Sequence, residues 1–418
     1  MEVKESLVKL RREFHQMAET GWLEFETTIS IIDYLQSYGY NVEFGKSIHS
    51  ERMGLPTKEE IENYADSLSI ERDYDIGEIL QGYTGAIAKL DTGNTGPTIA
   101  MRFDIDACGV GESKSEKHIP AKEGFASKNY NAMHACAHDG HISIGLNIAK
   151  WLIDNKSQLK GKYILIFQPA EEGVRGAKSI VGTGIFDGVD YFISGHIGMG
   201  IKENMLALGV LGFLATSKLD IYFEGEAAHA GANPESGKNA LLAAASCALN
   251  LHTLPQFGAG MSRLNVGTLV AGTGRNVVAS KAKLQIETRG ENEEVNQLLM
   301  EKVLKVIEGS ALAYDVEYRV EVVGGAPSYP MYDEEFINEI RTYLDNDKFN
   351  IVVGANLGGS EDVTYMMNEV EKNGGKTVFY LFGTNLKAGH HNNKFDFDED
   401  VLSMAYETYI KTITMLNK

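Results

Sequence analysis

Cysteine is scarce in this chain, which has only Cys108, Cys136 and Cys247 among its 418 residues. So few cysteines in so long a chain exclude a disulfide framework and are typical of a reducing compartment. Long apolar runs are also missing, since no stretch reaches the roughly 18 residues that a membrane helix needs. The charged N-terminus MEVKESLVKLRREFHQ lacks the apolar centre of a signal peptide. We therefore expect a cytoplasmic protein that has no membrane partner.

Basic residues are also few relative to acidic ones. The chain has 39 Lys and Arg against 58 Asp and Glu, which gives a formal net charge of -19. Such a field repels nucleic-acid phosphates and anionic membrane surfaces, so we expect no nucleic-acid partner. With 43% hydrophobic and 23% charged residues the composition is that of a globular protein, and its length predicts two or three domains.

Short apolar runs alternate with helical patterns over much of the chain, which predicts an α/β fold with a mostly parallel, doubly wound sheet. Four of these runs have the character of buried strands: TIAMRFDID (98–106), KYILIFQP (162–169), YFISGH (191–196) and TVFYLFG (377–383). A helix is predicted between the first two, with Asp139 at its N-cap. A further helix is expected after Pro56, in a polar segment that has the character of an insertion.

The pattern changes from residue 214 onwards. Predicted elements follow in the order β-α-β-β-α-β, which is the ferredoxin-like α+β motif. We therefore expect an inserted domain at 214–327, and a main domain formed by 1–213 and 328–418.

Residues that can ligate metals follow all four buried strands. The first strand ends in Asp104 and Asp106, the second leads to Glu171 and Glu172, the third ends in His196, and the fourth leads to His390 and His391. Because the carboxyl ends of parallel strands meet at one edge of a sheet, these side chains are expected to converge. Each alone is most simply a solvated loop residue, but four together favour a metal site.

The segment MHACAHDGH (133–141) supplies further ligands. Cys136 and His138 can converge on one ion in a turn that leads into a helix, and their chemistry suits zinc or a similar divalent metal. A redox or simply buried thiol is the alternative for Cys136. His134 and His141 remain candidates for groups around the ligands or the substrate. Cys108 and Cys247 are expected to be packing residues.

The pair Glu171–Glu172 predicts a division of labour, in which one carboxylate ligates metal and the other carries a proton from water to a leaving amine. A solvated surface pair is the alternative, and the apolar strand and Pro169 that precede the pair disfavour it. His229, in the inserted domain, is either a loop histidine or a donor to a carbonyl oxygen on which charge develops.

Several motifs together resemble the carboxypeptidase G-like metallohydrolases, in the branch that contains hippuricase, auxin-conjugate hydrolases and aminobenzoyl-glutamate hydrolases. The motifs occur in the family's order along nearly the whole chain: RRxxH (11–15), MRFDIDA, MHACAHDGH, FQPAEEG, SGHIG, GEAAHAGANP, RNVV and HHNNKFDFDED. The resemblance implies a catalytic metal-binding α/β domain at 1–213 and 328–418 and a lid and dimerisation domain at 214–327.

The resemblance also implies roles for particular residues. Five match the family's ligands for two divalent ions, manganese or zinc: Cys136, His138, Glu172, His196 and His391. Glu171 matches the general base, and His229 matches a lid histidine that reaches the partner subunit's active site. Asn276 and Arg289 match lid positions for the substrate's carboxylate, while Asp106 matches an orienting acid. His391 is preferred to His390 because of its spacing to Phe395.

One departure from the family lies at Ala137, where glycine is usual. If that position requires positive φ, alanine carries strain. The predicted reaction is hydrolysis of the amide bond of an N-acyl or N-aroyl amino acid such as p-aminobenzoyl-glutamate. Two alternatives stay open: a general aminoacylase or dipeptidase with the same site, and a structural subunit that needs a homologous catalytic partner. The expected assembly is a homodimer or a heterodimer with a homologous subunit.

Overall fold

The computed structural model describes residues 3–254, 257–344 and 350–418, and these divide into two compact units. Unit 1 comprises Met1–Leu211, Met331–Leu357 and Tyr365–Lys418, and unit 2 comprises Gly212–Pro330 and Gly358–Thr364. The boundaries expected at 214 and 327 lie close to these limits. The sequence did not indicate that residues 358–364 would join unit 2.

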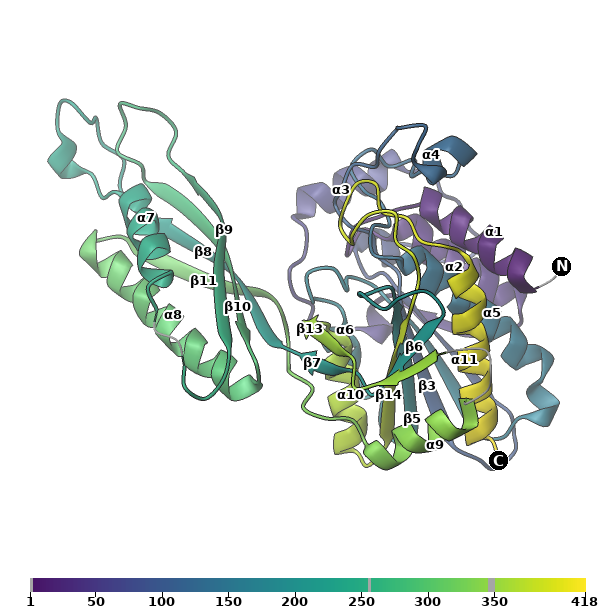
Figure 1. The fold of residues 1–418 in the computed structure, drawn as a ribbon. Helices are drawn as coiled ribbons and strands as arrows, with labels where there is room; N and C mark the ends of the chain where they lie inside the picture. Colours follow the sequence, from purple (N-terminus) through teal and green to yellow (C-terminus); the bar gives the residue numbers. More distant parts are fainter. Residues whose placement is uncertain (1–2, 255–256, 345–349) are drawn as a thin grey trace. The chain divides into compact units, whose positions relative to one another are not determined.

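Unit 1 is built on an eight-stranded sheet with the order β1-β2-β4-β3-β5-β14-β6-β12. Strands β3, β5, β6 and β14 of this sheet are labelled in Figure 1. Its strands are β1 (Val42–Phe44), β2 (Ala86–Asp91), β3 (Thr98–Asp104), β4 (Lys162–Gln168), β5 (Tyr191–Ile197), β6 (Met205–Leu208), β12 (Asn350–Val353) and β14 (Lys376–Phe382). The four strands predicted from sequence are the central ones, β4-β3-β5-β14, and each pairs in parallel with its neighbour. The predicted α/β fold class is confirmed.

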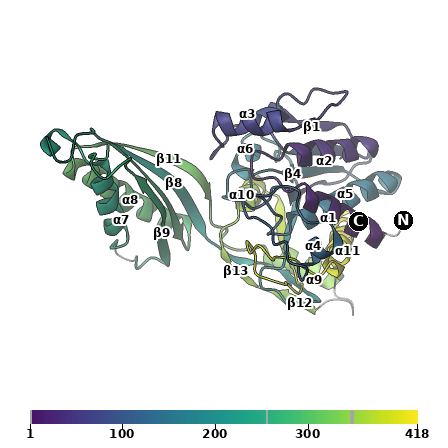
Figure 2. The same cartoon turned by 90° about the horizontal axis from the view of Figure 1, so that it is seen from above.

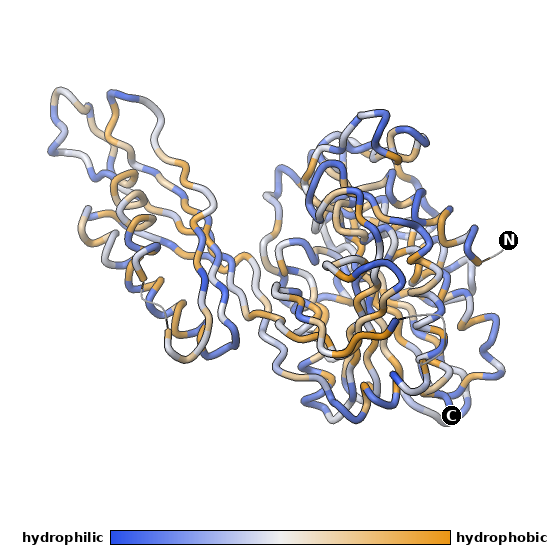
Figure 3. The backbone as a smooth tube through the Cα atoms, viewed as in Figure 1, coloured by the Kyte–Doolittle hydropathy of each residue, from blue (hydrophilic) through white to orange (hydrophobic). Residues whose placement is uncertain are grey.

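Helices cover both faces of this sheet. The helices in this part of the described chain are α1 (Val3–Gln16), α2 (Phe25–Ser37), α3 (Lys58–Ser67), α4 (Ile119–Glu123), α5 (His138–Asp154), α6 (Ala177–Val181), α9 (Glu334–Leu344), α10 (Val363–Lys372) and α11 (Asp400–Leu416). Helices α1, α5 and α11 lie on one side of the sheet, and α6 and α10 lie on the other (Figure 2). Apolar residues concentrate in the central strands between them (Figure 3), and there they form the core. The helix expected after Pro56 is α3, which begins with a capping box between Thr57 and Glu60.

The prediction that Asp139 caps helix α5 is wrong. The helix begins at His138, and its N-cap is Ala137, two residues before Asp139, in the left-handed region at φ 67°. The carboxylate of Asp139 instead accepts hydrogen bonds from Arg11 (2.9 Å) and His15 (2.7 Å). Two residues of the RRxxH motif therefore hold the first turn of this helix.

Unit 2 has the predicted ferredoxin-like order. Its elements are β8 (Ala215–Glu224), α7 (Ala240–Leu251), β9 (Ser262–Ala271), β10 (Lys281–Gly290), α8 (Glu293–Ala313) and β11 (Glu317–Ala326), and the sheet order is β11-β8-β10-β9. Helices α7 and α8 pack on one face of this sheet over a separate apolar core. Cys247 is buried in that core, as expected for a packing residue. Short strands β7 (Leu211–Phe213) and β13 (Asn356–Gly359) pair with each other where the chain connects the units.

Within the described ranges no helix has both the length and the apolar character needed to cross a bilayer.

Candidate metal centre

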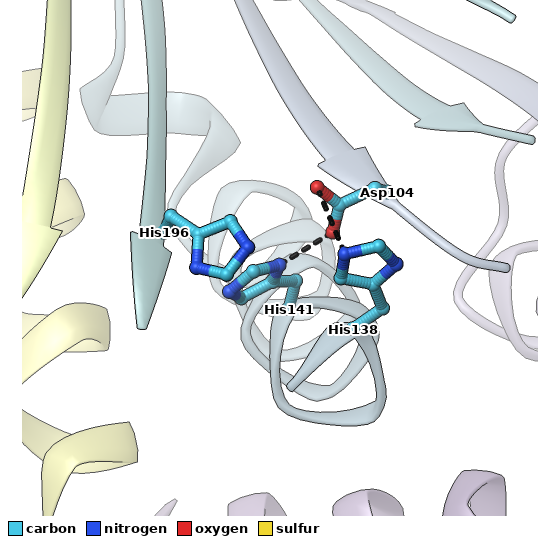
Figure 4. A group of neighbouring side chains, drawn as sticks. All are labelled: Asp104, His138, His141 and His196. Carbon is cyan, nitrogen blue, oxygen red and sulfur yellow. Dashed lines mark hydrogen bonds and ion pairs between the residues drawn. The ribbon is translucent and has the colours of Figure 1, made fainter. Parts of the chain in front are cut away.

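Ligand-type side chains gather at the carboxyl ends of the central strands of unit 1. Strand β3 ends at Asp104, and β5 carries His196 next to its last residue. Helix α5 follows β3 in the chain and begins with His138. Figure 4 shows Asp104, His138, His141 and His196 turned toward one another from these three elements.

His138 is held with one ring nitrogen available to a cation. Its Nδ1–H donates to the backbone carbonyl of Asp106 at 2.8 Å, so in the neutral ring Nε2 carries the lone pair. Nε2 is buried and has no hydrogen-bond partner within the described residues, although carboxylate oxygens of Asp104 and Glu171 each lie 3.8 Å away. Burial opposes a charge on this ring, but nearby acids led by Asp104 raise the pKa of His138 well above its usual value. The surroundings therefore favour a positive charge at this point.

His196 and Cys136 lie together behind His138. His196 Nδ1–H donates to the backbone carbonyl of Ile197 at 2.8 Å, and its Nε2 lies 3.5 Å from Cys136 Sγ. Burial lowers the pKa of His196 well below its usual value, which keeps the ring neutral. Burial and the neighbouring Glu172 carboxylate raise the pKa of the Cys136 thiol. A bound cation reverses that effect, because metals bind the thiolate and the neutral imidazole.

Glu172 connects this cluster to the C-terminal segment. Its Oε1 lies 3.2 Å from His391 Nε2 and also accepts a hydrogen bond from the Cys108 thiol at 2.9 Å. Its backbone N–H donates to Asp106 Oδ2 at 2.9 Å. Asp106 therefore contacts both His138 and Glu172, which is what an orienting acid has to do. Cys108 is buried in the apolar core, as expected for a packing residue, and its thiol in addition touches a predicted ligand.

The two adjacent histidines, His390 and His391, differ in their surroundings. His390 Nε2 accepts the backbone N–H of Met199 at 3.2 Å, while its Nδ1 lies 3.5 Å from Cys136 Sγ. Burial lowers the pKa of His390 to about 4, so the ring is neutral and Nδ1 carries the hydrogen that faces the sulfur. His390 thus orients the Cys136 thiol, and this arrangement favours His391 as the ligand.

Three groups of these side chains bring potential ligand atoms within 4.8 Å of one another. They are Asp104, His138, His141 and His196; Cys136, His138 and Glu172; and Cys108, Glu172 and His391. His138 belongs to the first two groups and Glu172 to the last two, so all five predicted ligands lie in one connected cluster. Thiol, imidazole and carboxylate groups in this combination suit zinc and other first-row divalent metals.

Glu171 lies on a strained loop that Glu24 holds. Ala170 and Val174, on either side of the glutamate pair, have φ of 52° and 56°, which is rare for residues other than glycine. The buried carboxylate of Glu24 accepts hydrogen bonds from Ala170 N–H and from the Thr84 hydroxyl, both at 2.7 Å. Sequence reasoning did not identify Glu24. The one signal was an acid in the otherwise apolar GWLEF segment.

His141 also has a defined place beside the cluster. Its Nδ1–H donates to Asp104, and its Nε2 accepts the backbone N–H of Ile197 at 3.1 Å. Arg102 donates to the other oxygen of Asp104 at 2.6 Å. His141 therefore fixes the end of β5 next to His196, a positioning role among those that the sequence had left open for it.

Three of the predicted residues lie in unit 2 on exposed or half-buried positions. His229 and Asn276 are close neighbours, since the backbone N–H of Ala230 donates to the carbonyl of Asn276 at 3.0 Å. Arg289 lies near the far end of β10, where its guanidinium donates to Glu287 at 3.1 and 3.2 Å. Strands rise about 3.3 Å per residue, so most of the length of β10 separates Arg289 from the other two. The fold of unit 2 thus does not bring His229 and Asn276 to Arg289.

Comparison with known proteins adds to this geometry. A family model described as "Peptidase family M20/M25/M40" matches residues 100–415. The chain is 42% identical to one of the subunits of p-aminobenzoyl-glutamate hydrolase from Escherichia coli strain K12, over 96% of this chain and 94% of that protein. It is 43% identical to the indole-3-acetyl-aspartic acid hydrolase of Enterobacter agglomerans, over 98% and 95%.

Among solved structures, the fold is similar to that of the aminobenzoyl-glutamate utilization protein from Klebsiella pneumoniae. The TM-score is 0.83 and the sequence identity 38%, over 99% of this chain and 96% of that chain. The likeness therefore covers both units.

Proposed function

The chain belongs to the peptidase family M20/M25/M40, and from this premise we propose that it hydrolyses the amide bond of an N-acyl or N-aroyl amino acid, with p-aminobenzoyl-glutamate as the favoured substrate. The resemblance inferred from the motifs is confirmed, and so is the class of enzyme, a hydrolase that acts on amide bonds. Relatives of 42–43% identity that are named for hydrolysis of such conjugates support the substrate.

The connected cluster around His138 carries the proposal. A buried imidazole nitrogen without a partner among the described residues, a protonated thiol and several carboxylates lie together at the edge of the sheet. We assign two divalent ions, manganese or zinc, to five ligands: Cys136, His138, Glu172, His196 and His391. When bound, such ions polarise a carbonyl group and lower the pKa of a coordinated water.

Glu171 is the proposed general base and acid. Its carboxylate lies 3.8 Å from His138 Nε2, and it is buried beside the ligands without belonging to the assigned set. It takes a proton from the attacking water as the C–O bond forms. It then gives that proton to the amine nitrogen as the C–N bond breaks, which releases a carboxylic acid and a free amino acid.

The lid residues complete the proposal. His229 donates to the carbonyl oxygen as negative charge develops there, and Asn276 and Arg289 bind the carboxylate of the substrate. Because His229 and Asn276 lie at the end of the sheet opposite Arg289, one substrate can meet all three only if two lids contribute. Strand β9 is an edge strand with exposed Leu269 and Val270, and a second sheet paired antiparallel to it would bring opposite ends together.

We therefore propose a dimer, either of two copies or with a homologous subunit, in the cytoplasm. The Escherichia coli relative is named as one subunit of its hydrolase, which supports an assembly of more than one chain. A general aminoacylase or dipeptidase with the same site is the second candidate, since the site residues themselves do not select the acyl group. A purely structural role is disfavoured, because such a chain has no use for the buried Glu171 beside five ligands.

The test is an assay of the purified chain, alone and with zinc or manganese, against p-aminobenzoyl-glutamate, acyl-amino acids and dipeptides. Metal analysis and mass determination are made on the same sample. We expect two metal ions per chain, a dimer, and the highest kcat/KM with p-aminobenzoyl-glutamate. Preference for dipeptides or simple acyl-amino acids would favour the second candidate. A chain that binds metal and hydrolyses nothing until a homologous partner is added would favour the structural role.

A further inference from the structure

The face of the unit 2 sheet that its helices leave uncovered holds a pocket near the start of β9 and the end of β10. It has a volume of about 440 Å³ and is lined by Arg263, Leu264, Asn265, Glu287 and Arg289. Along β10 the residues Leu284, Ile286 and Thr288 are buried, whereas Glu287 and Arg289 are only half-buried. The pocket therefore lies on the side of the sheet away from helices α7 and α8.

Strand register places two arginines opposite each other in this pocket. Arg289 on β10 pairs with Arg263 on β9. The next pair on the same face of the sheet is Glu287 with Asn265. On its other side Glu287 pairs with Lys218 of β8. Like charges directly opposite each other destabilise a sheet, so this arrangement has a cost that packing does not explain.

The charges in this pocket do not balance. Glu287 is the one carboxylate that lines it, and it binds Arg289 at 3.1 and 3.2 Å. Among the residues that the structure describes, the side chain of Arg263 has no hydrogen-bond or ion-pair partner. The same is true of the side chain of Lys218, which pairs with Glu287 from β8 and does not line the pocket. The pocket is thus locally positive in a chain whose net charge is -19, which is the electrostatic character of an anion site.

We propose that Arg263 is a specificity-determining residue, which binds the side-chain carboxylate of an N-acylated acidic amino acid while Arg289 binds its α-carboxylate. This inference rests on the proposed function, which assigns the α-carboxylate to Arg289. It narrows the substrate class from N-acyl amino acids in general to N-acyl glutamate and aspartate.

The geometry of the pair fits two carboxylates on one short chain. Directly opposed side chains leave the sheet about 5 Å apart, and each planar guanidinium can hold one carboxylate through two hydrogen bonds. Glu287 already occupies Arg289 in this way, which shows that a carboxylate fits there. Two relatives are named for substrates with an acidic amino acid, glutamate in one and aspartic acid in the other.

The experiment compares N-benzoyl-glutamate with N-benzoyl-glutamine, which differ in the charge of the side chain and little in shape. In the full-length, metal-loaded protein, Arg263→Ala is expected to lower kcat/KM for the glutamate substrate roughly 10- to 100-fold, as for loss of one charge-assisted interaction. The glutamine substrate should change less than about threefold. Arg263→Lys should recover part of the loss, and Arg289→Ala should impair both substrates.

Arg319→Ala is the matched control, because Arg319 is an exposed arginine on the same sheet that pairs with Glu321. It should leave both substrates unchanged. An equal loss on both substrates in Arg263→Ala, or no loss on either, overturns the inference while the proposed function stands.

A calorimetric titration with the same two compounds separates the remaining cases. If the wild-type chain hydrolyses neither but binds N-benzoyl-glutamate more tightly through Arg263, the proposed function fails and the selectivity holds. If it neither hydrolyses them nor distinguishes them in binding, both are overturned.

Discussion

The two units present their chemical groups in opposite ways. In unit 1 Asp104, His138 and His196 are at most 1% exposed, and each is held by a hydrogen bond to another group of unit 1. In unit 2 His229 and Asn276 lie on loops at exposed positions, and Arg263 lies exposed on an edge strand. A buried, cross-linked site is organised by the fold before any ligand arrives, whereas accessible groups become a site only when a substrate or a second chain meets them.

Backbone strain follows the same division. Non-glycine residues with positive φ lie in or next to the cluster of unit 1, at Ala137, Ala170, Val174 and His391. Among the described residues of unit 2, Asp315 is the only one of this kind. Such strain persists where the surrounding structure enforces it, and it is commonly found at active sites. The comparison predicts that changes in unit 1 affect both chemistry and stability, and changes in unit 2 chiefly chemistry.

The largest effect is expected at Glu171. Replacing it by alanine should lower kcat by up to roughly 10⁴-fold, the upper range for loss of general acid–base catalysis, while two metal ions remain bound. Glu172→Ala, one residue away, should lose metal as well as activity. Steady-state kinetics and metal analysis of both variants test this prediction. Near-normal turnover of Glu171→Ala would show that Glu171 is not the general base.

The next effect is on stability, at Arg11. This buried guanidinium forms ion pairs with Asp139 (2.9 Å), Asp396 (2.7 Å) and Glu399 (3.1 Å). Arg11→Met leaves these acids without their cation, so it should destabilise unit 1 by about 3–5 kcal/mol in urea unfolding. Lys283→Met is the control in unit 2. The ion pair between the partly exposed Lys283 ammonium and Asp220 should contribute less than about 1 kcal/mol to the free energy of unfolding. Equal losses in both variants would contradict the comparison.

A smaller effect on catalysis is expected at His229. Removal of one donor to the developing oxyanion should lower kcat by roughly 10²- to 10³-fold and leave the unfolding midpoint unchanged, because the side chain lies on a loop outside the apolar core. If His229 acts in the partner's site, mixing inactive Glu171→Ala and His229→Ala chains should restore part of the activity. Activity that stays absent in verified mixed dimers would place His229 outside the partner's site.

The sequence predicted the parts of the fold that depend on local pattern. The four central strands, the ferredoxin-like unit and the helix after Pro56 all follow from periodicity and turn residues. Convergence of Asp104, Glu172 and His196 followed from the rule that parallel strands end at the same edge of a sheet. The short strands β1, β6 and β12 were missed, since three or four residues carry too little periodicity to be recognised.

Contacts between segments that are distant in the chain could not be predicted from local sequence pattern. Nothing local in GWLEFET indicates that Glu24 holds the backbone of Ala170, and the thiol of Cys108 meets Glu172 only because β3 and β4 are neighbours. Asp139 was misplaced for a similar reason. An acid near a helix start is typical of an N-cap, but here the ion pair with Arg11 determines its position.

The smallest effect concerns Ala137, where the sequence had raised the question of strain. The observed φ of 67° confirms that the position lies in the left-handed region. Ala137→Gly relieves a strain of about 1–2 kcal/mol, but it removes a fully buried methyl group worth about 0.8 kcal/mol and adds chain entropy to the unfolded state. The free energy of unfolding should therefore change by less than about 1 kcal/mol. Ala137→Val should destabilise by more than about 2 kcal/mol, because a β-branched side chain tolerates this region poorly and overpacks a buried site. Urea unfolding of both variants measures the difference, and equal stability of the glycine and valine proteins would show that the left-handed backbone at Ala137 does not constrain the entrance to α5.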